Sequence, residues 1–229
     1  MVTEIDRPPT LTAVVVDAIR DAILRGDMLP GRPLREVKLS EQLDVSRGTV
    51  RDALRQLQDD GLVEVVPHRG AFVRNLTPRT ARELYTLRAV LEPYAVRLAL
   101  ENDAYTEDDL AAMAELGRRV DELEQRTDAT YETVSVDVEF HRQLCTPSGH
   151  QLLLDVFSSL QALSWLFVFN TKLYQSDAYS DEPSHYEVFQ SIQRGDPDLA
   201  AETVREHIEQ AGSALLARME ELHLNGPGD

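Results

Sequence analysis

The chain has 229 residues, of which 42% are hydrophobic and 28% are charged, and its formal net charge at pH 7 is -17. These proportions are ordinary for a soluble globular protein, so the chain can bury a packed core. Its single cysteine, Cys145, excludes an intramolecular disulfide and fits a reducing compartment. Because no unbroken apolar run approaches the ~18 residues of a membrane-spanning helix and the N-terminus lacks a signal pattern, we expect a cytoplasmic protein with no membrane partner.

The acidic charge is unevenly distributed along the chain. Residues 1–77 carry 11 Lys and Arg against 12 Asp and Glu, a net charge of -1, whereas residues 78–229 carry 12 against 28, a net charge of -16. This asymmetry predicts two modules. The first can gather arginines on one face, and the acidity of the second discourages its own contact with nucleic acid.

The N-terminal module reads as a helix-turn-helix. After a flexible arm at residues 1–9, a helix is predicted from Leu11 that Gly26 ends. Its apolar face, at three- and four-residue spacing, is predicted to be Val14, Val15, Ala18, Ile19, Ala22 and Ile23. A second helix is expected over residues 34–43 and a third after Ser46, a good helix N-cap. The buried stripe of the third helix is predicted to be Val50, Ala53, Leu54 and Leu57.

The N-terminal half of that third helix carries Arg47, Thr49 and Arg51 off the buried stripe. A recognition helix presents such residues to the major groove, where arginine can contact guanine and a hydroxyl can bond a phosphate or base. Spacing alone slightly favours a merely solvated face, but the helix-turn-helix context favours DNA binding. A β-branched hairpin follows over residues 62–74, with Arg69 at its tip and a turn that needs the backbone freedom of Gly70.

Three stretches, ILRGDMLPGRPL, VSRGTVRDALRQLQDDGLVEV and PHRGAFV, resemble the winged helix-turn-helix domain of the GntR family of bacterial transcription regulators. Gly48-Thr49 departs from the Thr-Pro that many relatives carry. The resemblance implies contacts with double-stranded operator DNA by Arg35, Ser46, Arg47, Gly48, Thr49, Arg51, Arg69 and Gly70.

The rest of the chain reads as helices and lacks strand-like alternation. Helices are predicted over residues 78–100, with a kink or local break at Pro93, and over 106–126, 130–144, 150–174, 183–194 and 197–222. The apolar faces of three of them are predicted to include Leu87, Val156 and Leu199. We therefore predict a mainly α protein in which a winged helix-turn-helix is followed by an antiparallel helical bundle. The expected parts are an arm (1–9), a DNA-binding domain (10–75), a linker (76–80), an all-helical domain (81–223) and a tail (224–229).

Asp137 and His141 lie four residues apart and therefore share one helix face, while His185 and His207 lie on later helices. One carboxylate and three imidazoles suit Zn²⁺ or Ni²⁺. Spacing by itself does not show that the four converge, and a lone histidine on a helix is more often a core residue than a ligand.

Residues 78–223 also resemble the FCD-type effector domain of the FadR subfamily within the GntR family, through Asp137-Val138-Glu139-Phe140-His141 and the two later histidines. In the metal-containing branch, this resemblance implies a Zn²⁺ or Ni²⁺ ion held by Asp137, His141, His185 and His207. It also implies a small carboxylate effector bound by Arg88 and Asn170. Ser184 departs from the acidic residue that commonly precedes the second histidine.

Two functions follow from this reading. The first is a homodimeric DNA-binding regulator, a repressor or an activator with the repressor preferred, that reads a pseudo-palindromic operator and senses an organic acid through a metal. The second is a metal-dependent hydrolase, because a metal with an open position can activate water. The motif places no general base beside the ligands, since Glu139 points elsewhere on its helix, and this favours the regulator.

Overall fold

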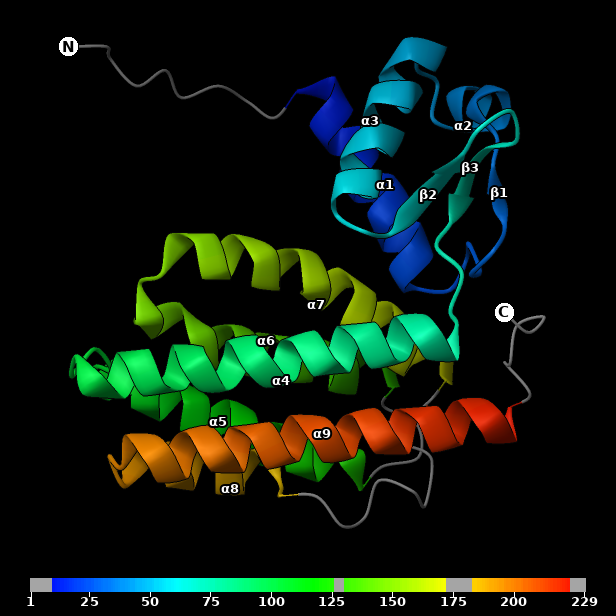
Figure 1. The fold of residues 1–229 in the computed structure, drawn as a ribbon. Coiled ribbons are helices and arrows are strands. Elements are labelled where there is room, and N and C mark those ends of the chain that lie inside the picture. The colour runs from blue at the N-terminus through cyan, green and yellow to red at the C-terminus, as the bar shows by residue number, and fades with distance from the viewer. Residues whose placement is uncertain (1–9, 126–129, 172–182, 223–229) are drawn as a thin grey trace, which may run out of the picture. The chain divides into compact units, whose positions relative to one another are not determined.

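The computed structural model describes residues 10–125, 130–171 and 183–222, which divide into two compact units at Asn75 and Leu76 (Figure 1). A winged helix-turn-helix forms the first unit and a helical bundle the second, so the predicted fold class is confirmed. The predicted arm at 1–9 and tail at 224–229 lie outside the described residues.

The first unit contains three helices and three short strands among its described residues. Its strands pair antiparallel in the order β1-β3-β2. The elements are α1 (Leu11–Leu24), β1 (Pro33–Leu34), α2 (Glu36–Gln42), α3 (Arg47–Asp59), β2 (Val63–Val66) and β3 (Gly70–Val73).

Local chemistry sets the limits of α3 and of the wing formed by β2 and β3. The Ser46 hydroxyl accepts a hydrogen bond from the Thr49 backbone N–H at 3.1 Å and so caps α3. The predicted stripe of α3 is buried against the rest of the unit. Gly70 has a φ of 96°, a left-handed conformation that glycine adopts without strain, as the sequence predicted.

Two details of the first unit differ from the prediction. The second helix begins at Glu36 rather than at residue 34, because Leu34 pairs with Ala71 of β3 and extends the sheet. On α1 the buried face includes Val16, whereas Val14 is 49% exposed. An unbroken valine run offers two overlapping helix faces, and only packing against α3 selects one of them.

The second unit is an all-helical bundle in which α4 and α9 lie side by side and antiparallel (Figure 1). Its elements are α4 (Pro78–Glu101), α5 (Glu107–Glu124), α6 (Thr130–Cys145), the 3-10 turn η1 (Thr146–Ser148), α7 (Gln151–Thr171), α8 (His185–Gln193) and α9 (Pro197–Glu221).

Several apolar positions predicted to face the core are exposed instead. Leu87, Val156 and Leu199 are 39%, 44% and 43% exposed. The helix α4 also continues through Pro93 without the predicted break. Proline removes a single backbone donor, and the packing of α4 along α9 stabilises the helix on both sides of that position.

The helix α7 corrects the expectation that no segment could span a membrane. Among the described residues, α7 is long and apolar enough to cross a membrane, judged by length and composition alone. Its mean hydropathy is 1.7 over its most apolar window. The polar residues within α7 interrupt the apolar run, but they do not lower its mean hydropathy below that of a membrane-spanning helix. It packs against α6, α4 and α9, and a core helix of a soluble bundle meets the same criterion.

Cys145 is fully buried at the end of α6, and this burial together with the negative charge of Glu92 raises the pKa of its thiol well above the ordinary value. Because the thiolate is the reactive form, we expect no labelling by a disulfide reagent at pH 8 in the folded protein. One equivalent should react after unfolding in denaturant. Labelling of the folded protein as fast as free glutathione would contradict this burial.

Candidate metal centre and DNA-binding face

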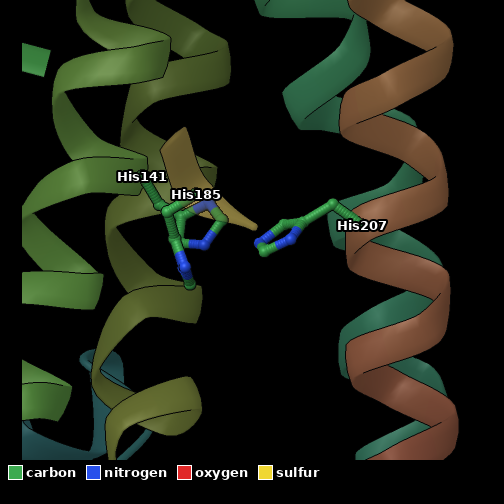
Figure 2. Close-up of side chains that lie close together, drawn as sticks. All are labelled: His141, His185 and His207. Carbon is green, nitrogen blue, oxygen red and sulfur yellow. The ribbon is translucent and has the colours of Figure 1, made fainter. Parts of the chain in front are cut away.

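The four predicted metal ligands converge inside the bundle. Asp137 and His141 come from α6, His185 is the first residue of α8 and His207 lies on α9. All four are buried, and the three imidazoles face one another (Figure 2). One nitrogen of each histidine lies within 4.8 Å of the others. Asp137 Oδ1 lies 2.9 Å from His185 Nε2 and 3.4 Å from His141 Nε2, so its carboxylate shares the same space.

The outer ring nitrogen of two histidines is hydrogen-bonded. His141 Nδ1 lies 2.7 Å from Glu92 Oε2, and His207 Nδ1 lies 2.8 Å from the carbonyl oxygen of Pro183. Both partners are acceptors, so each Nδ1 carries a proton, and in the neutral ring Nε2 is the nitrogen left to bind a metal. Metal-binding histidines in proteins are held in this way.

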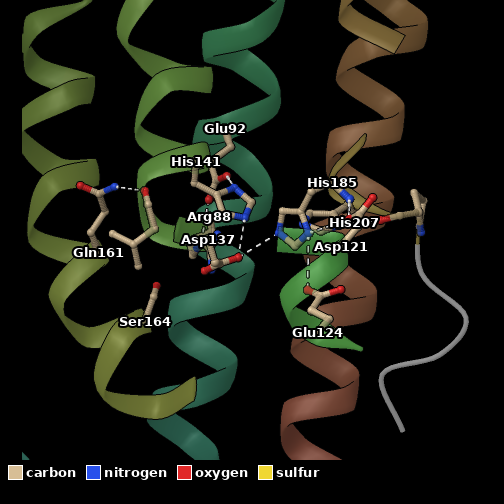
Figure 3. A network of polar contacts seen from close by, with 12 residues as sticks. Arg88, Glu92, Asp121, Glu124, Asp137, His141, Gln161, Ser164, His185 and His207 are labelled. Carbon is tan, nitrogen blue, oxygen red and sulfur yellow. Dashed lines mark hydrogen bonds and ion pairs between the residues drawn. The ribbon is translucent and has the colours of Figure 1, made fainter. Parts of the chain in front are cut away.

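The third histidine is held by its backbone as well as by its ring. Asp121 accepts hydrogen bonds from the backbone N–H groups of His185 and Tyr186, at 3.1 and 3.3 Å. His185 Nδ1 faces Asp121 at 3.7 Å and Glu124 at 3.6 Å (Figure 3). Ser184, whose side chain caps α8, fixes where that helix begins. The position of His185 is thus set by α5 together with α8.

The charges of the cluster shift the ionisation of its members. Burial opposes ionisation of Asp137, but hydrogen bonds from His141 and His185 outweigh it and hold the pKa of the carboxyl well below its usual range. Burial also opposes protonation of His185, but hydrogen bonds to Asp121 and Asp137 raise its pKa well above the ordinary value. Burial and the neighbouring histidines lower the pKa of His207.

This donor set fits a borderline divalent metal ion. Three imidazole nitrogens and one carboxylate oxygen are ligands that Zn²⁺ and Ni²⁺ accept. Four carboxylates gather here with one arginine, so the cluster carries an excess of negative charge that a cation would neutralise. The carboxylates belong to Glu92, Asp121, Glu124 and Asp137.

The two predicted effector residues lie in different surroundings. Arg88 is 4% exposed, and its Nε donates to Glu92 Oε1 at 2.6 Å, which joins it to the histidine cluster (Figure 3). Asn170 is half-buried near the end of α7, and its amide donates to the carbonyl oxygen of Leu166 in the same helix at 2.8 Å.

The predicted DNA-binding residues belong to the first unit. Ser46, Arg47 and Gly48 are exposed at the start of α3. Arg51, one turn later, forms a two-pronged ion pair with Glu36 of α2, from Nε to Oε1 at 3.0 Å and from Nη2 to Oε2 at 2.7 Å. The others are Arg35 before α2, Thr49 on α3, and Arg69 and Gly70 in the wing.

Sequence reasoning missed the residues that hold the metal-site histidines in place. The spacing of Arg88 and Glu92, four residues apart on a predicted helix, was a usable signal for an ion pair. No sequence signal connects Asp121 with His185. Gly117 on α5 was also missed, although a Cβ there would lie 3.2 Å from backbone atoms of His185 and Tyr186.

The replacement Gly117→Ala tests whether this close approach places His185. The added methyl should push the start of α8 away from α5, and we expect affinity for Zn²⁺ to fall on the order of tenfold, as when outer contacts of a metal site are disturbed. Competition with a chelator measures the change. Ala112→Ser adds one atom at an exposed position of α5 and should have no effect. Unchanged Zn²⁺ affinity in the Gly117→Ala protein would contradict this role of the glycine.

Comparison with known proteins places this architecture in a family. The model of bacterial regulatory proteins of the gntR family matches residues 11–73, and the FCD domain model matches residues 83–210. The Nta operon transcriptional regulator of Aminobacter aminovorans is 35% identical over 131 residues, which span 57% of this chain and 60% of that protein. A protein of Paenarthrobacter nicotinovorans named "Probable D-xylose utilization operon transcriptional repressor" is 29% identical over 87% of this chain and 86% of its own length.

A solved structure is similar to the chain over both units. The crystal structure of a GntR transcriptional regulator from Rhodococcus sp. RHA1 has a TM-score of 0.74 and 27% identity, and the match covers 90% of this chain and 97% of that one. The family and these relatives are transcriptional regulators and not enzymes, which excludes the hydrolase considered from the sequence. The chain belongs to the GntR family, as a DNA-binding transcriptional regulator whose C-terminal part is an FCD domain.

Proposed function

We propose that this DNA-binding regulator is a cytoplasmic repressor of the FadR subfamily that senses a small organic acid through a bound metal ion. In this proposal residues 10–75 bind the operator, residues 76–80 link the domains, and residues 81–223 bind the metal and the effector. The observation that carries the proposal is the convergence of three buried imidazoles on the Asp137 carboxylate.

Asp137, His141, His185 and His207 would hold the ion, with Zn²⁺ or Ni²⁺ the best match to their donor atoms. When bound, the metal supplies a positive charge that can attract the carboxylate of an effector. The protein's own residues bury the site and fix the direction of each donor. The support for this division of roles is the set of hydrogen bonds that hold His141 and His207 by Nδ1.

The effector in this proposal is a small carboxylate bound by Arg88 and Asn170. Arg88 supports it because the guanidinium is buried in the same polar network as the histidines and can bind a carboxylate with strong charge-assisted hydrogen bonds. Since Nε already bonds Glu92, the effector would be bound by the Nη nitrogens. A thermal-shift screen of small carboxylates on the metal-loaded protein would identify the effector.

The operator would be read by a homodimer, because two recognition helices on two half-sites require two-fold symmetry. An exposed apolar row on α4, made of Leu87, Val90 and Tyr94 at 39%, 65% and 49% exposure, supports an interface between copies of the chain. Effector binding would shift the balance between states that bind DNA and states that do not. Such a shift requires that the effector bind one of these states more tightly.

The metal site is tested by replacing two ligands at once. The double variant His141→Ala and His207→Ala leaves one imidazole and one carboxylate, too few donors for tight binding, so we expect loss of bound metal by elemental analysis after loading with Zn²⁺. His150→Asn is the matched control, because His150 accepts a hydrogen bond from the Leu153 N–H at the start of α7 and asparagine can replace that acceptor. A full equivalent of bound metal in the double variant would contradict the assignment of these residues as metal ligands.

The DNA face is tested by Arg47→Ala, measured on DNA fragments that the wild-type protein enriches from a random pool. Loss of one arginine contact to a base costs about 1–3 kcal/mol, so affinity should fall roughly 5- to 150-fold while the fold is retained. Arg25→Ala at the C-cap of α1, outside α2, α3 and the wing, is the control, and this variant should bind DNA normally. Affinity that stays unchanged at physiological salt would overturn the assignment of α3 as the recognition helix.

A further inference from the structure

We propose that Glu92 is a positioning residue that fixes the tautomer of His141, so that Nε2 of this histidine faces the metal. The inference rests on the proposed metal site and adds to it a residue that is not itself a ligand. It concerns how the protein prepares the site before any ion is bound.

The carboxylate of Glu92 is clamped on both of its oxygens. It is fully buried on α4, where Oε1 accepts from Arg88 Nε at 2.6 Å and Oε2 pairs with His141 Nδ1 at 2.7 Å. Figure 3 shows His141 between Glu92 on one side and Asp137 on the other. Because Arg88 lies one turn away on the same helix, the carboxylate cannot turn from the histidine without breaking a buried ion pair.

A neutral imidazole carries its proton on either nitrogen, and its neighbours decide which. An ionised carboxylate can only accept a hydrogen bond, so Glu92 requires the proton of His141 to be on Nδ1. Asp137 Oδ1 is a competing acceptor 3.4 Å from Nε2, but Glu92 Oε2 is nearer to its nitrogen, at 2.7 Å from Nδ1. The neutral ring therefore keeps its proton on Nδ1 and its lone pair on Nε2, toward the centre of the cluster. The other tautomer would present an N–H to the metal and could not bind it.

A purely structural role for Glu92 would require only its ion pair with Arg88 and not the contact with His141. An ion pair with Arg88 would neutralise the buried charge and would leave the second oxygen free to take any donor. Instead that oxygen lies at hydrogen-bond distance from a candidate metal ligand on a different helix. The two readings predict different results for a replacement that keeps the shape of Glu92 but removes its charge.

The test compares Glu92→Gln and Glu92→Leu with the wild-type protein and with Glu83→Gln. Glu83 is an exposed partner of Arg79 on the same helix, so its replacement controls for the loss of one carboxylate from α4. The first readout is affinity for Zn²⁺ by chelator competition. The second is the ¹⁵N spectrum of the His141 ring in the metal-free protein, which reports the tautomer directly.

We expect the Nδ1–H tautomer in the wild type and in Glu83→Gln, and a shift toward the Nε2–H tautomer in Glu92→Leu, because Asp137 beside Nε2 then lacks its competitor at Nδ1. Zn²⁺ affinity should fall about 10- to 100-fold in Glu92→Leu, which is the usual cost of losing an outer partner of a ligand. The Zn²⁺ affinity of Glu92→Gln should lie between those of the wild type and Glu92→Leu. The glutamine amide oxygen can still accept a hydrogen bond from His141 Nδ1, but the amide can also rotate. If Glu92→Leu does not fold, the tautomer of His141 in Glu92→Gln tests whether Glu92 sets that tautomer.

A single Nδ1–H tautomer and wild-type Zn²⁺ affinity in the Glu92 variants would overturn the inference. If the wild-type protein takes up no Zn²⁺ or Ni²⁺, the proposed metal function fails by itself. The ring spectrum still tests Glu92 in that case, because it is recorded without metal.

Discussion

The bundle depends on the requirement that buried charge be matched. Carboxylates in a low-dielectric core are costly unless each oxygen has a donor or a cation beside it. Here the carboxylates of Glu92 on α4, Asp121 on α5 and Asp137 on α6 meet this requirement only when α4, α6 and α8 contribute partners together. The polar cluster therefore constrains the register of these helices, and the same hydrogen bonds direct two histidine nitrogens inward.

Close backbone approach is the second constraint on the bundle. Gly117 lets α5 approach the first residues of α8, and a Cβ on Gly212 of α9 would lie 2.8 Å from the Cβ of Tyr85 on α4. The first contact lies at the start of the helix that carries His185, and the second lies on the helix that carries His207. A site whose four donors come from three helices needs such small residues wherever an average side chain would separate the helices.

Arginine side chains have different surroundings in the two units. On α3 the guanidinium of Arg51 is half-exposed and is held at its Nε and Nη2 edge by Glu36, which leaves the Nη1 end directed elsewhere. In the bundle, Arg88 is buried and its charge balances a carboxylate that also contacts a histidine. The first arrangement suits recognition of a large anionic partner from solvent, and the second suits a buried, preorganised site.

The sequence by itself determined the fold class, the order of the elements and the identity of the polar residues. Hydrophobic spacing and capping residues such as Ser46 act within a few residues of one another, so a local pattern is enough to find them. The family motifs also named Asp137, His141, His185 and His207, although nothing in their spacing required them to meet.

Only the tertiary structure decided which of several apolar faces is buried, where β1 forms, and which side chains support the histidines. Val14 and Val16 are equally hydrophobic, and packing against α3 chose between them. Asp121 and His185 are 64 residues apart, and their hydrogen bond exists because α5 and α8 are packed side by side. The physical reason is that local propensity acts along the chain, whereas burial and charge pairing depend on segments that meet only after folding.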